Sequence, residues 1–554
     1  MKKKNFPVGI SDFSKIIQND FYYIDKTGLI QELLTRDKFE VILFTRPRRF
    51  GKTLAMSMLS AFFDIRKDSR KLFQGLRISQ NKELCAVWMN QYPTLFFSLK
   101  DVDGLSFSSA YDMLTIKLAD LFGQHSYLLE SASVSENDKS VFVRIRNNQA
   151  SQAEIKNAFV LILRMMNAYY GKPAVFLLDE YDVPIAKAES KGYYEQMMEV
   201  ISALLGTALK DNSSLCFAVI TGCLRITKES VFTGTNNFVV DTISDCRYNE
   251  YFGFTDDEVQ KLLKDTDCSP FAEEIRAWYD GYRFGDLDIY CPWDVLNYVQ
   301  KLRSTGTWEP ENFWANTSDN AIIRSFLERT DFDITEKFET LLTGGTICES
   351  IDEELTYNTL TSSEQNIWSL LYLTGYLTKK GTVTGSQKVY LKIPNAEVRD
   401  IFQKSVIEWF NDKSVKSDRH LLFQALWNME AERLTELLSD LLFSTISYHD
   451  YAESYYHAFL TGLFSSAGYI VESNFENGLG RSDVVVKDRQ NRKAAVIEVK
   501  ISDSVDRMER DCQKALRQIE ENQYALGIEK EGFKKVIRYG IAFYRKQCMV
   551  LAEN

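Results

Sequence analysis

VILFTRPRRFGKTL, residues Val41–Leu54, opens with an apolar run rich in β-branched residues and passes through a basic turn into Gly51-Lys52-Thr53. Apolar residues at helical spacing follow, so the stretch predicts a strand, a phosphate-binding loop and a helix in that order. Amides at the helix N-terminus would cradle phosphate oxygens, Lys52 would place its charge on the terminal phosphates, and the Thr53 hydroxyl would ligate magnesium. The stretch therefore predicts a nucleotide-binding P-loop.

One position departs from the eight-residue P-loop pattern, because Arg46 stands where the pattern begins with glycine. Pro47 fixes its own backbone φ at about -65°, and we expect it to stiffen the loop entrance. The neighbouring arginines add positive charge near the phosphates, so we expect tight nucleotide binding and slow turnover, as in a regulatory switch. The predicted nucleotide-binding residues of the loop are Arg46, Arg48, Arg49, Gly51, Lys52 and Thr53.

The composition is that of a large globular protein. Its 554 residues, 45% of them hydrophobic, suffice for roughly two to four domains with real cores. A net charge of -11 opposes nonspecific adhesion to nucleic acid or anionic membranes but leaves room for a local basic groove. Nine cysteines without a CxxC pair, and four histidines without zinc-like spacing, indicate reduced thiols and a cytoplasmic location. We expect no signal peptide and no membrane partner, because polar residues follow the basic start and no apolar run reaches membrane-spanning length.

Residues 1–245 predict an α/β domain with a largely parallel sheet. Strand-like apolar runs alternate with helical patterns such as Glu154–Tyr169, and ligands of such sheets bind at the carboxyl ends of the strands. The expected strands are Glu40–Thr45, Thr94–Leu99, Ala174–Leu178 and Leu215–Thr221. Together with the phosphate loop, they predict a P-loop NTPase domain.

The third of these strands runs into Asp179-Glu180, which resembles a Walker B motif. In such a motif Asp179 would hold the magnesium, through water, and Glu180 would polarise the attacking water. Strands often end in acids without any function, but the order relative to the P-loop favours the catalytic interpretation. Arg225 follows the fourth strand and is a candidate γ-phosphate sensor; an exposed surface arginine is the alternative.

Two regions separate this domain from the last one. Residues 246–345 turn helical, with Asp256–Leu263 and Phe271–Tyr279 as clear pieces, and would suit a helical lid over the nucleotide. The aromatic-rich stretch Trp278–Tyr298 indicates a packed structural knot rather than a base-stacking platform. Residues 346–412 are compatible with a winged-helix-like module, which either binds DNA or merely connects domains, and we favour the connector. Its expected elements are helix Glu364–Tyr376, strand Lys388–Ile393 and helix Ala396–Phe410.

A second chemical centre is predicted in the last domain, residues 413–554. The stretch GLGRSDVVVKDRQNRKAAVIEVK, Gly478–Lys500, has the pattern of two strands around the polar turn Asp488–Lys493. That turn puts Asp483 directly opposite Glu498, with Cβ atoms about 4.5–5.5 Å apart. Period-2 alternation puts Lys500 on the same face as Glu498, so three charged side chains converge.

Opposed like charges are destabilising unless a cation lies between them, and carboxylate oxygens suit magnesium or manganese. Such a metal can generate hydroxide and bind a phosphate oxygen, while the Lys500 ammonium orients the water or offsets charge at phosphorus. The pattern therefore predicts phosphodiester hydrolysis, with Asp483 and Glu498 as metal ligands. The alternative is an ordinary exposed hairpin with scattered charges, because bare spacing of this kind is common.

The flanking segments are those that a small nuclease core needs. Upstream, Tyr448–Ser466 has a helical pattern, and its Glu453 is either a further carboxylate of the metal cluster or a solvated helix residue. Downstream, Val505–Asn522 has an apolar helix face. The polar residues available toward a cleft are Lys514, Gln518 and Tyr524.

The C-terminal region resembles the PD-(D/E)XK nuclease superfamily. Its segments ESYYHAFLTGL, GRSDVVV and AAVIEVK are similar to those of the nuclease domain found behind AAA-ATPase-like domains in bacteria. The N-terminal region is similar to that ATPase partner through YYIDKTGLI, RPRRFGKTL, LLDEYDVPI, WYDGY and CPWDVLNY. The resemblance covers most of the chain and implies that the RP-x-RF form is a family feature. It implies nucleotide and magnesium roles for Lys52, Thr53, Asp179 and Glu180, and nuclease roles for Asp483, Glu498, Lys500 and Glu453.

Two functions stay open at this point. The first is a cytoplasmic ATPase whose nucleotide state controls a metal-dependent nuclease acting on DNA, in a defence or mobile-element setting that rests on the resemblance alone. The second is a nucleotide-gated protein that holds ATP and grips nucleic acid or a protein partner without cutting. The expected cofactors are ATP and Mg²⁺, with Mn²⁺ as an alternative at the nuclease site, and a homo-oligomer is compatible with either function.

Overall fold

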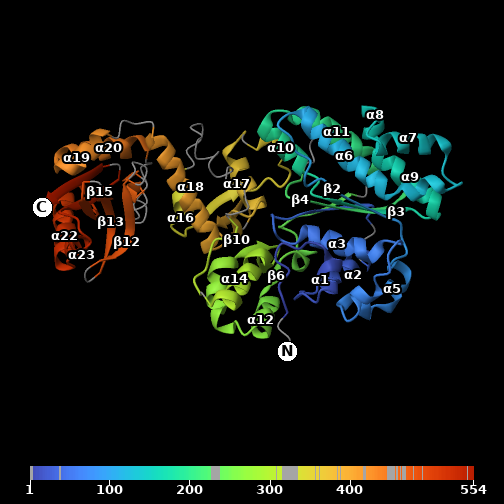
Figure 1. The fold of residues 1–554 in the computed structure, drawn as a ribbon, viewed down its shortest axis with the longest axis horizontal. Helices are drawn as coiled ribbons and strands as arrows, with labels where there is room; N and C mark the ends of the chain where they lie inside the picture. The colour runs from blue at the N-terminus through green and yellow to red at the C-terminus, as the bar shows by residue number, and fades with distance from the viewer. Residues whose placement is uncertain are drawn as a thin grey trace. The chain divides into compact units, whose positions relative to one another are not determined.

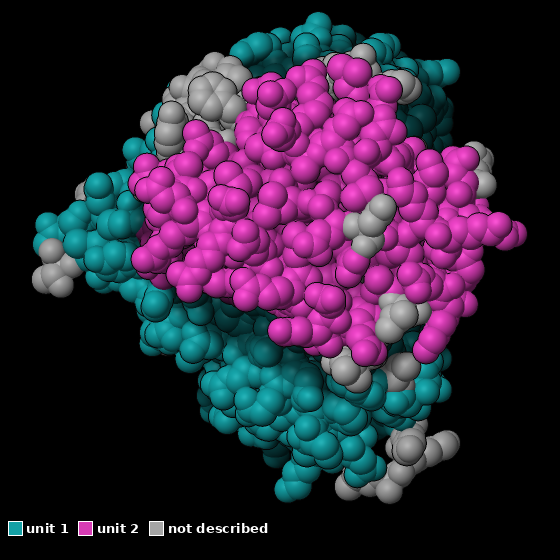
Figure 2. All heavy atoms as spheres, turned by 90° about the vertical axis from the view of Figure 1, so that its left-hand side faces the viewer, with its two compact units in different colours: residues 1–316, 348–398 teal, residues 317–347, 399–554 magenta. Residues whose placement is uncertain are grey.

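The structure is a computed structural model. Contacts divide the chain into two compact units, residues 1–316 with 348–398 and residues 317–347 with 399–554 (Figure 2). The described residues are 4–35, 39–225, 238–306, 308–314, 335–355, 357–360, 362–383, 385–386, 388–415, 420–445, 456, 459–461, 463–464, 469–477, 480–489, 491–545 and 547–553.

Five parallel strands form the main sheet of the first unit, in the order β2-β3-β4-β1-β5 (Figure 1). Their bounds are β1 Val41–Thr45, β2 Thr94–Ser98, β3 Ala174–Asp179, β4 Leu215–Gly222 and β5 Phe238–Asp241. All four expected strands are present, while the edge strand β5 was not predicted. Because β4 lies between β1 and β3, the loop after β1 and the acids after β3 flank the carboxyl end of β4.

Helices cover both faces of this sheet (Figure 1). On one face, alternate strand residues share a core with helices that include α6 Phe107–Gln124, α7 Glu136–Arg146, α9 Ala158–Tyr170 and α11 Tyr194–Leu209. The helix expected at Glu154–Tyr169 is divided, because α8 Gln152–Lys156 ends at Asn157 before α9 begins. The other helices of this region are α1 Phe13–Gln18, α2 Gly28–Thr35, α3 Lys52–Phe63, α4 Arg70–Phe73, α5 Lys82–Trp88 and α10 Val183–Lys191.

The region predicted as a helical lid contains helices and also a small antiparallel sheet. The part of it that belongs to the first unit has the helices α12 Asp256–Asp265, α13 Ala272–Tyr279 and α14 Pro292–Thr305. The sheet has the order β6-β8-β7, with bounds β6 Phe254–Thr255, β7 Tyr282–Phe284 and β8 Leu287–Tyr290. Tyr282 and Phe284 are buried and pack on Phe50 of the phosphate loop, which agrees with the packed-knot interpretation of the aromatic stretch.

Residues 348–398 belong to the same unit as the parallel sheet. Helix α17 Glu364–Leu373 ends three residues before its predicted end, because Thr374 caps it and Gly375 takes a φ of +89°. This region also contains a sheet of order β10-β11-β9 and the first residues of α18 Ala396–Val415, and its winged-helix-like character stays a prediction. Its strands are β9 Ile347–Ser350, β10 Thr378–Thr382 and β11 Lys388–Lys392. The domain boundaries at 245, 345 and 412 stay predictions.

The second unit is built on a mixed sheet of order β12-β13-β14-β15-β16, in which only the β14–β15 pair is parallel. Its strands are β12 Ile470–Asn477, β13 Gly480–Asp488, β14 Lys493–Ile501, β15 Lys535–Tyr544 and β16 Gln547–Glu553. One face packs on α19 His420–Asn428 and α20 Ala431–Thr445, and the other on α22 Met508–Glu521 and α23 Tyr524–Lys530. Helix α16 Thr335–Leu342 also belongs to this unit. Most of the expected helix Tyr448–Ser466, including Glu453, lies outside the described residues.

Candidate functional sites

The loop between β1 and α3 has two residues with positive φ. Gly51, at +86°, is the N-cap of α3, and Arg49, at +70°, adopts a backbone conformation that side-chain-bearing residues rarely take. Lys52 is 5% exposed, and its Nζ donates to the carbonyl oxygens of Arg46 and Pro47, both at 2.8 Å. The loop's own carbonyls therefore hold the Lys52 charge at the N-terminus of α3, where anion binding is favoured.

Arg46 has a structural role in this structure, and its predicted nucleotide contact stays a prediction. Its side chain is wholly buried and forms an ion pair with the Asp241 carboxylate at the end of β5. The guanidinium also donates to the Thr45 and Asp241 carbonyl oxygens, at 2.9 and 3.0 Å, and lies over the rings of Phe252 and Phe284. Because the described hydrogen bonds of its side chain go to the last residues of β1 and β5, Arg46 ties these strands together beneath the loop.

The acids after β3 lie close to the P-loop lysine. Asp179 is wholly buried, and its Oδ1 accepts a hydrogen bond from Thr221 Oγ1 at 2.6 Å. The pKa of Glu180 is raised by burial and by the charge of Asp179, and the charge of Lys52 opposes that rise. Glu180 also has a positive φ of +53°. The structure thus brings Lys52, Asp179 and Glu180 to one end of the sheet, while Thr53 is half-buried in the first turn of α3.

Asp182 is a site residue that the sequence pattern missed. It is 1% exposed, and its Oδ2 accepts hydrogen bonds from the backbone amides of Cys223 and Leu224 at 2.8 and 3.0 Å. The same oxygen accepts a hydrogen bond from the Tyr357 hydroxyl at 3.0 Å. The only available signal was an acid three residues after Asp179, and nothing near it in sequence indicates a tyrosine partner.

Two predicted arginines adjoin this carboxylate. Burial lowers the pKa of Arg48. The charges of neighbouring groups, Tyr357 and Asp182 among them, raise this pKa by a larger amount, so the net shift is upward. Arg225 follows the end of β4 and pairs with the Glu354 carboxylate at 3.3 Å. The predicted sensor arginine therefore has an anionic protein partner in this structure. The third arginine, Arg49, lies over the Trp293 ring and donates to the Phe313 carbonyl oxygen at 3.0 Å.

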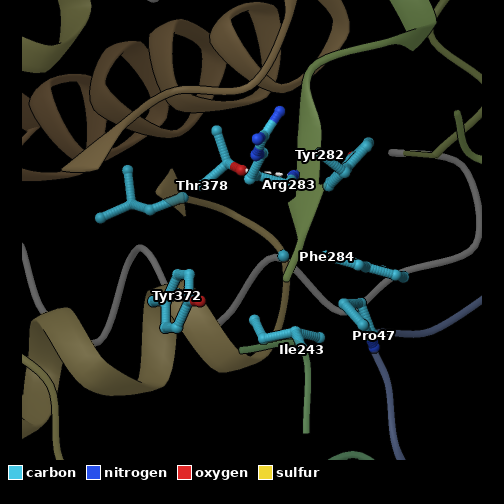
Figure 3. A pocket seen from close by; sticks show the side chains of 9 residues that line it. Pro47, Ile243, Tyr282, Arg283, Phe284, Tyr372 and Thr378 are labelled. Carbon is cyan, nitrogen blue, oxygen red and sulfur yellow. Dashed lines mark hydrogen bonds between the residues drawn. The ribbon is translucent and has the colours of Figure 1, made fainter. Parts of the chain in front are cut away.

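A small hollow lies beside the loop entrance (Figure 3). It has no enclosed space for even a water molecule, whereas ligand pockets hold roughly 300–1,000 Å³. Gly375 approaches Pro47 so closely that an added Cβ would lie 3.0 Å from Pro47 Cβ. Nearby, the Arg283 amide donates to Thr378 Oγ1 at 2.8 Å. The hollow is therefore a packing gap between the loop and residues 372–378, and not a nucleotide pocket.

The C-terminal hairpin has the predicted strand register. Val484 pairs with Ile497 and Lys487 with Ala494. The ladder ends at the first of these pairs, and extending the same register by one residue puts Asp483 opposite Glu498. Beyond this ladder, a side chain takes the place of a backbone acceptor, because Asp483 Oδ2 accepts a hydrogen bond from the Val499 amide at 2.8 Å. The two carboxylates therefore converge at the end of the β13–β14 pairing.

Glu498 is the most perturbed acid of this hairpin. It is 1% exposed because α22 covers its face of the sheet, whereas the sequence pattern placed only the other face in a core. Burial and the charge of Asp483 raise its pKa to about 7, and Lys500 opposes this rise. Its Oε1 accepts hydrogen bonds from Lys500 Nζ, at 3.2 Å, and from Gln518 Nε2. No described residue forms a hydrogen bond with its buried Oε2.

Comparison with known families agrees with both domain predictions. Residues 7–232 match the family described as predicted AAA-ATPase, and residues 451–553 match the PD-(D/E)XK nuclease superfamily. The chain carries an AAA-ATPase-like domain and a PD-(D/E)XK nuclease superfamily domain. A protein of Azotobacter chroococcum mcd 1, described as "Uncharacterized protein in vnfD 5'region", is 27% identical over 504 residues, which span 88% of this chain and 87% of the relative. No described helix has the length and apolar character to cross a membrane.

In the nuclease-superfamily domain, two carboxylates are placed so that they could hold a divalent cation. Within the described part of the chain, no group of three or more His, Cys, Asp or Glu residues could hold a metal, and the third candidate acid, Glu453, lies outside it. Magnesium usually keeps several waters and needs only one or two protein carboxylates beside phosphate oxygens. Asp483 and Glu498 supply that number, and the Glu498 oxygen without a described partner suits a cation.

Helix α22 of this domain contributes Gln518 to the site, as the sequence suggested. Lys514 lies one turn away and donates to Asp511 Oδ1 at 2.7 Å. Tyr524 does not line a cleft, because it is 1% exposed within the core beneath α22 and α23. The structure also separates them by element, because Lys514 and Gln518 lie on α22 whereas Tyr524 begins α23.

Proposed function

We propose that this protein is an ATP-binding P-loop ATPase whose nucleotide state regulates a metal-dependent nuclease, acting on DNA, in its C-terminal domain. The observation that carries the proposal is the convergence of Asp483, Glu498 and Lys500, with a buried Glu498 oxygen that has no described partner. The presence of an ATPase-like and a nuclease-superfamily domain supports both halves.

The residues of the nuclease site have separable roles in this proposal. A bound Mg²⁺ or Mn²⁺ would supply a polarised water and neutralise phosphate charge. Asp483 and Glu498 would hold the ion; the Val499 amide orients the first carboxylate, and Gln518 orients the second. Lys500, with 26% of its side chain exposed, would offset charge that develops at phosphorus. Glu453 stays a proposed further acid.

In the ATPase-like domain, Lys52 and the loop amides would bind the phosphates, with Thr53 and Asp179 holding Mg²⁺ and Glu180 orienting water. Arg48, Arg49 and Arg225 would add positive charge. The buried Arg46–Asp241 pair anchors the loop, which supports tight binding and slow turnover. All nine cysteines are unpaired, which supports a reducing compartment such as the cytoplasm. We assign residues 1–245 to the ATPase domain, 246–345 to a lid, 346–412 to a connector and 413–554 to the nuclease domain.

The purified protein is expected to cleave DNA with Mg²⁺ or Mn²⁺, and Lys500→Ala is expected to lower cleavage about 10²–10³-fold, as for loss of a charge-stabilising donor. ATP binding by this variant should be unchanged. The matched control is Lys534→Ala, an exposed lysine of the same unit, which should cleave like wild type. Equal metal-dependent cleavage by Lys500→Ala and wild type would rule out the assignment.

The alternative is a nucleotide-gated switch that binds nucleic acid or protein without cutting. The net charge of -11 favours it, since it opposes strong binding of a polyanionic substrate. ATP turnover measured with and without DNA separates the two functions. Stimulation of turnover by DNA would exclude the passive switch.

A further inference from the structure

A segment distant in sequence closes the sheet end that carries the proposed nucleotide site. We call it the cap segment, residues 353–355 and 357. Its side chains make three described polar contacts with the sheet end: Glu353 Oε2 with Thr242 Oγ1 at 2.9 Å, Glu354 Oε1 with Arg225 at 3.3 Å, and Tyr357 OH with Asp182 Oδ2 at 3.0 Å. All three partners follow the carboxyl end of a parallel strand, where such sheets bind their ligands.

Arg225 is incompletely satisfied by the cap segment. Its side chain is 28% exposed, and its buried Nε has no hydrogen-bond partner among the described residues. Its described anionic partner, Glu354, is 53% exposed and held by a single contact. Since a guanidinium binds carboxylate and phosphate oxygens with the same donors, either anion can take this position.

Tyr357 anchors the cap segment to the turn that carries Arg225. Its hydroxyl donates to Asp182, and the same carboxylate oxygen holds the amides of Cys223 and Leu224, which directly precede Arg225. The charges of Tyr357 and Asp182 also interact with Arg48 of the P-loop and raise its pKa. The cap segment therefore adjoins both the phosphate loop and the end of β4.

We propose that Glu354 is a built-in competitor for the terminal phosphate of a nucleoside triphosphate. Glu354 holds Arg225 in the nucleotide-free protein, and the γ-phosphate replaces it, while Tyr357 and Glu353 keep the cap segment in place. The proposal rests on the proposed nucleotide site and adds how that site distinguishes nucleotides. A diphosphate lacks the group that replaces Glu354, so only the triphosphate breaks the ion pair.

The test compares the affinities for ADP and for a non-hydrolysable ATP analogue, by calorimetric titration of the full chain. Glu354→Gln removes the competing charge and is expected to bind the triphosphate about two- to fivefold more tightly, the range for a partly exposed ion pair. Its ADP affinity should be unchanged. The matched control is Glu195→Gln, an exposed acid on α11 of the same unit, which should bind both nucleotides like wild type.

A second background shows whether the effect acts through Arg225. In an Arg225→Gln protein, adding Glu354→Gln should produce no further gain in triphosphate affinity, because the guanidinium for which Glu354 and the phosphate compete is absent. Thermal unfolding without nucleotide checks that each variant is folded. An unchanged triphosphate affinity, an equal gain for ADP, or a gain that persists without Arg225 overturns the proposal. If the wild-type protein binds no nucleotide, the proposed nucleotide site is overturned as well. If binding depends on Lys52 but Glu354→Gln has no effect, only the role of Glu354 as a competitor is overturned.

Discussion

Lys52 in the ATPase-like domain and Lys500 in the nuclease-superfamily domain both lie near a buried carboxylate at a strand end, but their surroundings differ. Lys52 is 5% exposed and bonds two carbonyl oxygens of its own loop. Lys500 has 26% of its side chain exposed and bonds the Glu498 carboxylate, whose other oxygen has no described partner. The first site is largely satisfied by the protein, while the second keeps unbalanced charge that a cation would relieve.

The interactions that hold the two sites in place also differ. The P-loop is anchored by the buried Arg46–Asp241 ion pair, which fixes β1 to the edge strand β5. The β13–β14 hairpin is held by side-chain hydrogen bonds instead, since Asp483 accepts one from the Val499 amide and Gln518 donates one to Glu498. We infer that changes in the P-loop support act mainly on stability, whereas changes in the hairpin act mainly on metal binding.

The largest effect is expected from breaking the buried pair. Arg46→Met would leave the Asp241 carboxylate buried without its cation, at a cost of about 3–5 kcal/mol in the free energy of unfolding of the first unit. The measurement is denaturant unfolding of the full chain, with metal binding by the nuclease domain as the independent readout. The control is Arg70→Met. This variant loses an exposed ion pair with Asp68, and that loss should leave the free energy of unfolding unchanged. An equal loss in both variants would contradict a special role for Arg46.

Next in size is the loss of the P-loop charge. Lys52→Ala should weaken nucleotide binding by about 10–100-fold, because it removes charge-assisted hydrogen bonds to phosphate. Calorimetric titration with ATP measures this, and Mn²⁺ affinity of the nuclease domain should stay the same. Lys71→Ala, an exposed lysine on α4 of the same unit, is the matched control. Nucleotide affinity that survives in Lys52→Ala would remove the distinction drawn between the two sites.

The smallest effect concerns pH at the second site. The pKa of Glu498 is raised from 4.5 to about 7, so without metal its contribution to stability is fully present below about pH 4.5 and is lost as pH rises through 7. A divalent cation binds the ionised form, so Mn²⁺ affinity should rise up to about tenfold per pH unit toward pH 7, with one proton released per ion.

Titrations at several pH values, in buffers of different ionisation enthalpy, measure both quantities. Glu498→Gln cannot ionise at this position, so its remaining Mn²⁺ affinity should lose this pH dependence. A flat profile for wild type, or the same slope in the variant, would show that Glu498 does not carry the unbalanced charge.

The local pattern of the sequence determined the P-loop, the four expected strands of the parallel sheet and the register of the β13–β14 hairpin. These features depend on residues close in sequence, because side-chain alternation and turn length fix a hairpin register and apolar runs fix buried strands. Pairing of an edge strand such as β5 and burial of an arginine such as Arg46 leave no comparable local signal.

Only the tertiary structure decided what covers each site. Tyr357 meets Asp182 across 175 positions of sequence, and Arg46 meets Asp241 across 195. Helix α22 buries the Glu498 face that alternation alone left open, and so raises its pKa. Such contacts follow from how distant segments pack, and packing depends on the fit of whole surfaces rather than on the period of any one stretch.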